Sequence, residues 1–528
     1  MTSTRFSGIS RCPGFHLGVA SGKDLFLYPV NRSTLGSAVN HQKPNILLIS
    51  IDSLRADHLS LYDYPCETTP YLSHLAQSGI VFENAFAASN WTGAAVASLI
   101  TGLYPTTHGY NNHYYYLLDG RDSLASILAE RNYYTICFSN NLYISSQTGL
   151  TQGFIKSFYR GSPEAPSIGR ESAILPLNGF RLWAGMKNLV PPCSKHLLKN
   201  VLDSFDHGRA LRRDDGAYAT EVAFGRFLQQ HATAQPFFAY IHYQEPHSVY
   251  CPPYPFRRRF FSGSWIDECQ ALSFDHMRYF AGKTEFSETQ VNRYKELYDG
   301  EIAYLDWRLG RLFDLLKSTN QYDNTLIVVT ADHGEMFGEH GYFWHAFCLY
   351  EPLMRVPLVI RYPEWFSPEC RRAEIVQTND IVPTILEGLG VDWQYKNEGQ
   401  GTSFLNGSSR TAAFCETDNP EMMIDRWLNR NNDLKRIDFQ HYFRDLTAMR
   451  TKEDKLIEAS DGLHEFYQLS PDPQESQNLF DLQSEVVKKR MAELVKWRET
   501  LKPHPVSSNH QSGFDKTTWE KMRALGYA

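Results

Sequence analysis

Short apolar runs alternate with amphipathic stretches over most of the chain. The clearest apolar runs are 45–51, 134–138, 236–242, 325–330 and 356–361. A continuous apolar run of this length is typical of a strand buried on both faces of a parallel sheet. The stretches with helical spacing are 71–79, 123–132 and 293–318. Strands that alternate with helices predict an α/β domain with a largely parallel central sheet flanked by helices.

The pattern changes at both ends of the chain and in one internal stretch. Residues 1–42 are predicted to be a poorly ordered N-terminal extension, and 43–395 to be the main domain. Within that domain, 155–215 is irregular and contains Pro, Gly and Arg, so we expect an insertion over one edge. Residues 396–528 are predicted to form a small α+β subdomain with a small antiparallel sheet and a closing helix.

Composition narrows the classes of partner. The 528 residues carry a net charge of -7, which gives no basic surplus for binding nucleic acid. No apolar run reaches transmembrane length, and the N-terminus lacks the continuous apolar segment of a secretory signal. The nine cysteines lack metal-binding spacing, which favours free thiols in a reducing compartment. These features predict a cytoplasmic protein without a membrane span; they do not determine an oligomeric state.

Charged side chains follow the predicted strands at one edge of the sheet. Asp52 comes after the first strand, Asp332 and His333 come after the strand at 325–330, and His242 ends another strand. Ligands of open α/β sheets bind beyond the carboxyl ends of strands. Two carboxylates and an imidazole are ligands that suit Mn²⁺, Zn²⁺ or Mg²⁺ better than Ca²⁺, which prefers a site made of oxygen ligands alone. A hydrogen-bonded turn would use the same residues, so spacing alone leaves both readings open.

A hydroxyl stands at the start of a predicted helix of small residues. The stretch NWTGAAVASLITGLYP, residues 90–105, predicts a helix that begins near Thr92 and ends at Gly102. Thr92 could simply cap this helix through its side-chain oxygen. Alternatively, a metal ion and the helix dipole could stabilise its alkoxide as a nucleophile. The residues alone leave both roles open.

Long, ordered segments of the chain resemble the sulfatase family of the alkaline phosphatase superfamily. The segments include PNILLISIDSLRADH through GLYPTTHG, then FFAYIHYQEPHSVY, TADHGEMFGEHGYFWHAF and DKLIEASDGLHEFYQLSPDPQESQNL, with the ending RALGYA. The resemblance covers roughly residues 43 to 528. It implies the α/β fold of that superfamily, with a small C-terminal α+β subdomain, and a metal-dependent hydrolase of small-molecule esters.

The chain departs from the family at the reactive position. Sulfatases carry Cys or Ser there and oxidise it to formylglycine, whereas the alignment places Thr92 in this slot and Val96 where arginine belongs. Oxidation of threonine, a secondary alcohol, gives a ketone rather than an aldehyde, so no formylglycine is expected. The resemblance to phosphodiesterases and head-group transferases that use threonine implies direct attack by Thr92 and a phospho-threonine intermediate.

The implied metal site also differs from that of many sulfatases. Asp52 is followed by Ser53 rather than a second aspartate, and His333 stands where many members have asparagine. The set Asp52, Thr92, Asp332 and His333 is similar to the single-metal site of the threonine-type transferases. The resemblance therefore implies one divalent ion, with Mn²⁺ preferred and Zn²⁺, Ca²⁺ or Mg²⁺ as alternatives.

Further positions acquire roles only through the resemblance. His247 matches a family histidine near the oxygens of the transferred group, and His345 stands where sulfatases often keep a lysine. As an imidazole, His345 could be a general acid for the leaving group. Residues that could contact substrate are His242, Asn111, Asn112 and His340. A core histidine, an aromatic-cluster histidine or a plain turn residue is the competing interpretation of these positions.

Four functions fit these observations to different degrees. Thr92 favours hydrolysis of phosphodiesters or phosphonate esters, whereas the family resemblance favours a sulfuric ester hydrolase that works without formylglycine. A phosphoryl head-group transferase is disfavoured because its relatives are usually anchored in a membrane. A non-catalytic binding module is disfavoured because the metal-ligating residues and the hydroxyl are all present.

Overall fold

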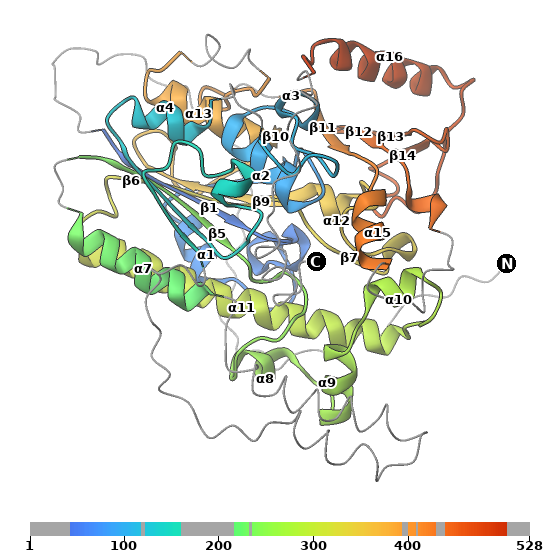
Figure 1. Ribbon diagram of the computed structural model, residues 1–528, viewed down its shortest axis with the longest axis horizontal. Helices are drawn as coiled ribbons and strands as arrows, with labels where there is room; N and C mark the ends of the chain where they lie inside the picture. The colour runs from blue at the N-terminus through green and yellow to red at the C-terminus, as the bar shows by residue number, and fades with distance from the viewer. Residues whose placement is uncertain are drawn as a thin grey trace, which may run out of the picture. The chain divides into compact units, whose positions relative to one another are not determined.

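The central sheet carries the strands after which the predicted metal residues lie. The computed structural model describes residues 43–117, 122–159, 216–231, 235–392, 400–407, 410–428 and 439–503. Within these residues the central sheet has the strand order β10-β2-β9-β6-β1-β5-β3-β4 (Figure 1). The strands are β1 Asn45–Ile51, β2 Ile80–Phe86, β3 Tyr134–Ser139, β4 Lys156–Tyr159, β5 Phe237–Tyr243, β6 Thr325–Ala331, β9 Arg355–Arg361 and β10 Cys370–Gln377. The predicted extension at 1–42 and residues 160–215 of the predicted insertion lie outside the described residues.

The sheet is largely parallel, which confirms the predicted fold class. Within the described part of this sheet, β9 alone runs antiparallel to its neighbours, β2 and β6. All five apolar runs of the sequence form strands of this sheet, and β1 has the predicted bounds. The sequence pattern missed β2 and β10, and it missed β4, which lies in the predicted insertion. Half-exposed Glu83 and Asn84 interrupt the apolar run of β2, and β10 is a partly exposed edge strand.

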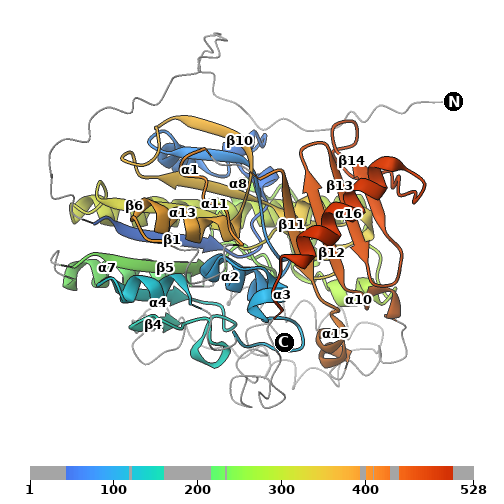
Figure 2. The same cartoon turned by 90° about the horizontal axis from the view of Figure 1, so that it is seen from above.

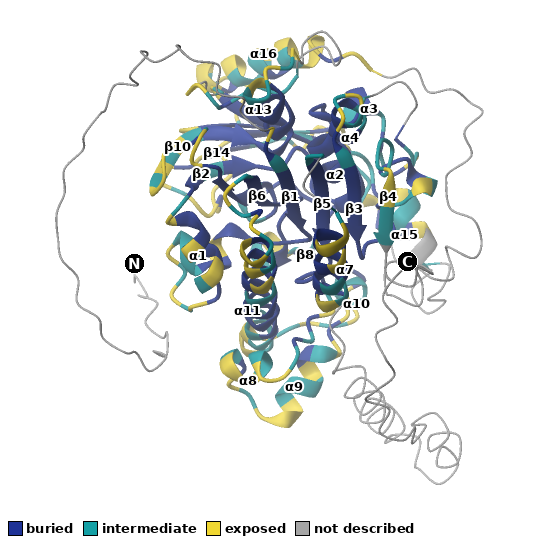
Figure 3. Cartoon of the chain, turned by 90° about the vertical axis from the view of Figure 1, so that its left-hand side faces the viewer, coloured by how far each residue is buried: buried dark blue, intermediate teal, exposed yellow. Residues whose placement is uncertain are grey.

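Helices cover both faces of the central sheet. The helices α1, α7 and α11 lie on one face, and α2, α4 and α13 lie on the other, so the strands between them are almost wholly buried (Figures 1 and 3). None of the helices in the described part of the chain is long and apolar enough to cross a membrane. The helices are α1 Pro70–Ala76, α2 Thr92–Thr101, α3 Pro105–His108, α4 Leu124–Ala129, α7 Ala217–Gln230, α8 Phe256–Phe260, α9 Trp265–Leu272, α10 His276–Phe280, α11 Glu288–Ser318, α12 Glu351–Met354, α13 Ile381–Gly388, α15 Glu421–Leu428 and α16 Glu485–Glu499.

A second, antiparallel sheet lies in the C-terminal part of the chain, where one was expected. It has the order β11-β12-β13-β14 and is covered by α16 (Figure 2). The rings of Phe414 and Trp497 stack at 4.2 Å and join the sheet to this helix. The amide side chain of Gln377, at the end of β10, pairs with the backbone of Phe414 and joins the two sheets. The strands are β11 Ala412–Thr417, β12 Leu446–Thr451, β13 Asp454–Ala459 and β14 Glu465–Gln468.

A buried ammonium group also joins the C-terminal sheet to the main domain. Lys455 on β13 is fully buried and lies 2.7 Å from Glu475 and 3.4 Å from Glu351, at the start of α12. Removing one partner of a buried ion pair leaves an uncompensated charge in a medium of low dielectric constant. The packing of the C-terminal sheet therefore depends on this lysine.

We expect Lys455→Met to lower the free energy of unfolding by about 3–5 kcal/mol, because the buried carboxylate of Glu475 loses its counter-ion. Lys488→Met is the matched control, because Lys488 is 49% exposed and pairs with exposed Glu485; its loss should stay within about 0.5 kcal/mol. Urea denaturation of both variants measures the difference. Equal stabilities would show that the Lys455 pairs contribute nothing to the packing.

Candidate functional site

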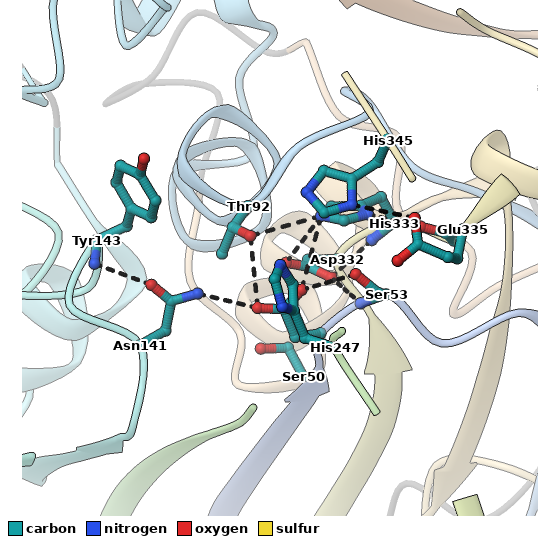
Figure 4. Close-up of polar contacts among 12 residues, drawn as sticks. Ser50, Ser53, Thr92, Asn141, Tyr143, His247, Asp332, His333, Glu335 and His345 are labelled. Carbon is teal, nitrogen blue, oxygen red and sulfur yellow. Dashed lines mark hydrogen bonds and ion pairs between the residues drawn. The ribbon is translucent and has the colours of Figure 1, made fainter. Parts of the chain in front are cut away.

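The strand register brings the predicted acidic residues together at one edge of the sheet. In the parallel ladders, Ile51 of β1 pairs with Ala331 of β6, so the residues that follow them, Asp52 and Asp332, emerge side by side. On the other side of β1, Ser50 pairs with His242 of β5. Figure 4 shows the resulting cluster, which gathers imidazole, carboxylate, hydroxyl and amide groups from several elements. Its carboxylates are completely buried.

Thr92 points its hydroxyl into this cluster and does not cap its helix. It is the first residue of α2, whose N-cap is Trp91 and which has no side-chain capping bond. The Thr92 Oγ1 atom lies 3.5 Å from Asp52 Oδ2 and 3.5 Å from His333 Nε2 (Figure 4). Every residue of α2 is buried, and its small side chains let the helix pack closely. The capping role considered from the sequence is therefore wrong.

The two buried carboxylates are held by fixed donors. The Asn141 amide donates to Asp52 Oδ2 at 2.9 Å, and the Ser53 hydroxyl donates to Asp52 Oδ1 at 3.0 Å. The backbone N–H groups of Ser53 and His333 donate to Asp332 Oδ1. Burial opposes ionisation of Asp52, but the charge of His247 and the close contact with the His242 ring outweigh it and lower the pKa of Asp52 far below the usual range. Burial and the charge of Asp52 raise the pKa of Asp332 well above its usual range.

Two imidazole rings face these carboxylates. The Nδ1 atom of His333 lies 2.8 Å from the carbonyl oxygen of Gly334, which can only accept, so Nδ1 carries the proton. The Nε2 atom of His333 then faces the cluster, 3.8 Å from Asp52 Oδ1 and 3.7 Å from Asp332 Oδ2. The Nε2 atom of His242 lies 3.5 Å from Asp52 Oδ2. Both rings are fully buried.

The cluster is chemically suited to a divalent cation. Asp332 Oδ2 and His242 Nε2 are buried and have no hydrogen-bond partner among the described residues. Donor atoms of Asp52, His242 and Asp332 lie within 4.8 Å of one another. Buried polar atoms in proteins are normally paired or bound to a metal ion. A mixed set of carboxylate oxygens and imidazole nitrogens suits Mn²⁺ or Zn²⁺.

The predicted catalytic histidines lie beside this cluster. The His345 ring lies 4.5 Å from the ring of His333 and 5.2 Å from that of His247. The Nδ1 atom of His345 lies 3.2 Å from a carboxylate oxygen of Glu335, whose other oxygen accepts a hydrogen bond from Tyr250. Burial, with the neighbouring His333 and His247, lowers the pKa of His345 well below its usual range. Burial raises the pKa of Glu335 to about 7.

Three other predicted residues have structural contacts away from the cluster. His340 stacks on Tyr350 at 3.7 Å, and its Nε2 atom lies 3.1 Å from the carbonyl oxygen of Gln474. Asn111 accepts two backbone hydrogen bonds from residues 113 and 114, as a turn residue does. Asn112 donates to Asp418, at the end of the C-terminal sheet's first strand. These contacts agree with the structural alternative considered from the sequence, and a substrate contact by any of the three side chains stays a prediction.

Several residues of the cluster were not predicted. Asn141 is the second residue after β3, so the rule that found Asp52 and Asp332 could also have found it. Glu335 lies two residues after His333, and no local signal distinguishes it from a surface glutamate. Ser53 has a backbone φ of 57°, which turns its N–H toward Asp332. Ser50 lies within an apolar run, and only the strand register relates it to His242.

Comparison with known proteins agrees with this geometry. The sulfatase family model matches residues 44–391, and a model described as N-sulphoglucosamine sulphohydrolase, C-terminal, matches residues 338–500. An N-acetylglucosamine-6-O-sulfatase of Bacteroides thetaiotaomicron is 22% identical over 92% of each chain. An arylsulfatase of Clostridium perfringens is 26% identical over 86% of this chain and 93% of that protein.

Relatives outside the sulfatases in the strict sense also match. The multifunctional alkaline phosphatase superfamily protein PehA of Trinickia caryophylli is 28% identical over 66% of this chain and 74% of that protein. The solved phosphonate monoester hydrolase of Agrobacterium radiobacter superposes with a TM-score of 0.61 at 22% identity, over 87% of this chain and 96% of that one. This chain therefore belongs to the sulfatase family of the alkaline phosphatase superfamily, whose members are ester-hydrolysing enzymes that use a divalent metal ion.

Proposed function

We propose that this enzyme hydrolyses phosphodiesters or phosphonate monoesters, with Thr92 as the nucleophile and one divalent metal ion. The observation that carries the proposal is the position of the Thr92 hydroxyl. It stands at the N-terminus of α2, within 3.5 Å of both Asp52 and His333, and serves no capping role. The N-terminus of a helix stabilises negative charge on such an oxygen and on the group that it attacks.

The chemistry of threonine favours phosphoryl transfer, because threonine cannot follow the formylglycine route by which sulfatases usually hydrolyse sulfuric esters. Formylglycine requires oxidation of a primary alcohol or thiol to an aldehyde, and threonine can give only a ketone. Thr92 must therefore attack directly and be regenerated by a second displacement. Several relatives are named as sulfatases, and hydrolysis of sulfuric esters by direct attack of Thr92 is the second candidate function.

The reaction proceeds as two displacements at phosphorus. The Thr92 hydroxyl gives up its proton and its oxygen forms a bond to phosphorus as the bond from phosphorus to the leaving alcohol breaks. The alcohol oxygen takes up a proton, so the step consumes no proton overall. Water then attacks phosphorus, the bond to Thr92 breaks, and the hydroxyl is restored. The N-terminal turn of α2 and the neighbouring imidazoles neutralise charge on the oxygens that do not react.

The metal ion would be held by Asp52, Asp332 and His333, together with the hydroxyl of Thr92. When bound, it would lower the pKa of the Thr92 hydroxyl and neutralise the two buried carboxylates. We favour Mn²⁺ because the donors mix oxygen and nitrogen, with Zn²⁺ the next choice.

We assign delivery of a proton to the leaving group to His247 rather than to His345. The pKa of His345 lies well below its usual range, so the ring is neutral near pH 7 and acts as a hydrogen-bonding group toward substrate oxygens. His247 donates from Nδ1 to the carbonyl oxygen of Ser248 at 2.7 Å, and this bond fixes its ring beside the cluster, 5.2 Å from the ring of His345. This assignment revises the general-acid role inferred for His345 from the sequence.

A comparison of ester classes tests the proposed substrate. The metal-loaded enzyme should cleave bis-p-nitrophenyl phosphate and a p-nitrophenyl phosphonate monoester with higher kcat/KM than p-nitrophenyl sulfate. The reason is that Thr92 can form and hydrolyse a phosphoryl adduct without the formylglycine chemistry on which sulfatases depend. A preference for the sulfate ester would establish the second candidate function instead.

Thr92→Ala should lower kcat by roughly 10³-fold or more, since the attacking oxygen is lost. Thr92→Ser should retain measurable turnover because it keeps the hydroxyl. The matched control is Thr101→Ala in the same buried helix, whose hydroxyl donates to the carbonyl of Ala97 at 2.6 Å and is distant from the chemistry. Steady-state turnover is the measurement, and wild-type turnover by Thr92→Ala would exclude the nucleophilic role.

Removal of the metal should abolish turnover, and addition of Mn²⁺ should restore it. Asp332→Asn should weaken Mn²⁺ binding and turnover together, because one anionic ligand becomes a neutral amide. The measurements are turnover after chelation and Mn²⁺ titration by calorimetry. Full activity of the chelated enzyme and of this variant would rule out metal dependence.

A further inference from the structure

We propose that His242 is a direct nitrogen ligand of the metal ion and that Ser50 and Tyr240 hold its ring in the ligating orientation. This inference rests on the proposed function only for the presence of a metal ion at Asp52. It adds a second imidazole to the set inferred from the sequence, in which His242 was a substrate contact at most. No part of the inference depends on which ester is hydrolysed.

The position of His242 is fixed by the sheet itself. His242 lies in β5, where its backbone pairs in register with Ser50 of the central strand β1. The Oγ atom of Ser50 lies 2.7 Å from His242 Nδ1 and 2.8 Å from the hydroxyl of Tyr240, two residues earlier on the same strand. All three side chains are fully buried. The ring is therefore held by two strands of the sheet rather than by a loop.

The hydrogen bond at Nδ1 of His242 determines whether Nε2 carries a proton or a lone pair. A serine oxygen has two lone pairs, so Ser50 Oγ can accept from both Tyr240 and the protonated Nδ1 of His242. The Nε2 atom then carries a lone pair. It lies within the metal cluster, is buried and makes no hydrogen bond with any described residue. Ligating histidines in proteins commonly donate their other ring nitrogen to such an orienting group.

The spacing of the donors agrees with a single ion between them. His242 Nε2 lies 3.5 Å from Asp52 Oδ2, and His333 Nε2 lies 3.8 Å from Asp52 Oδ1 and 3.7 Å from Asp332 Oδ2. Ligand atoms around a tetrahedral ion at about 2.1 Å lie about 3.4 Å apart. These three separations need to contract by only a few tenths of an ångström when an ion binds, and the donor atoms of Asp52, His242 and Asp332 all lie within 4.8 Å of one another.

A second imidazole ligand would change which metal ion the site prefers. Two carboxylates and two imidazoles make a mixed oxygen and nitrogen set, which favours Mn²⁺ or Zn²⁺ over Ca²⁺ and Mg²⁺. A rival interpretation makes His242 a protonated counter-ion of Asp52 that binds no metal. The two interpretations differ in the number of imidazole nitrogens bonded to the ion.

Electron spin-echo envelope modulation of the Mn²⁺-loaded full chain counts these nitrogens directly. We expect two bound imidazole nitrogens in the wild type and one in His242→Gln. Ser50→Ala should retain two nitrogens at saturating Mn²⁺ but bind it about 10–100-fold more weakly, as is typical when an orienting group is lost. The control is His58→Gln, a buried histidine that pairs with Asp299 instead; it should match the wild type in both readouts.

One bound nitrogen in the wild type, or no Mn²⁺ binding, would overturn the inference. Two nitrogens that persist in His242→Gln would do the same. Because one bound nitrogen in the wild type already contradicts the inference, the inference can be overturned even if a variant fails to fold. Turnover of the same samples separates this inference from the proposed function. Turnover with one bound nitrogen contradicts only the inference, whereas two nitrogens without phosphoester turnover contradict only the proposed function.

Discussion

Two carboxylates held side by side in a dry interior are the constraint on which the site depends. Asp52 and Asp332 follow adjacent parallel strands, and both are fully buried. Two negative charges less than about 5 Å apart repel by about 3 kcal/mol or more at an effective dielectric constant near 20. Burial and this repulsion raise the pKa of Asp332 well above its usual range, whereas the neighbouring imidazoles outweigh burial and lower the pKa of Asp52. A divalent cation between them removes the repulsion, and the surrounding imidazoles can share in binding it.

The rest of the structure can be understood as support for this arrangement. The central strands keep their register because they are buried between helical layers, and that register places Asp52, Asp332 and His242 at one edge. The buried helix α2 then brings Thr92 to the same point, with its N-terminus directed at the carboxylates. The C-terminal sheet contributes through contacts such as Asn112 with Asp418, which position the loops around the site rather than its reacting groups.

The sequence could predict the strands and site residues that follow from local pattern. It could not predict features that depend on contacts between residues far apart in the chain. The apolar runs located the strands around β1, and the polar residues after them located Asp52, Asp332 and His333. The antiparallel direction of β9 could not be read from its sequence, because both directions give the same apolar run in a buried strand. The contacts of His340 could not be predicted, because a left-handed turn, with φ of 54°, directs its ring to Tyr350 and Gln474. The pairing of Ser50 with His242 required the three-dimensional register.

The central claim is that an unmodified threonine is the nucleophile here, in the position that formylglycine occupies in sulfatases. The stereochemistry of hydrolysis at phosphorus tests this claim most directly. A phosphorothioate diester of known configuration, hydrolysed in ¹⁸O-labelled water, should give a product with retained configuration. Attack by Thr92 and then by water inverts the phosphorus centre twice. A product with inverted configuration would mean that water attacks the substrate directly and would contradict the nucleophilic role of Thr92.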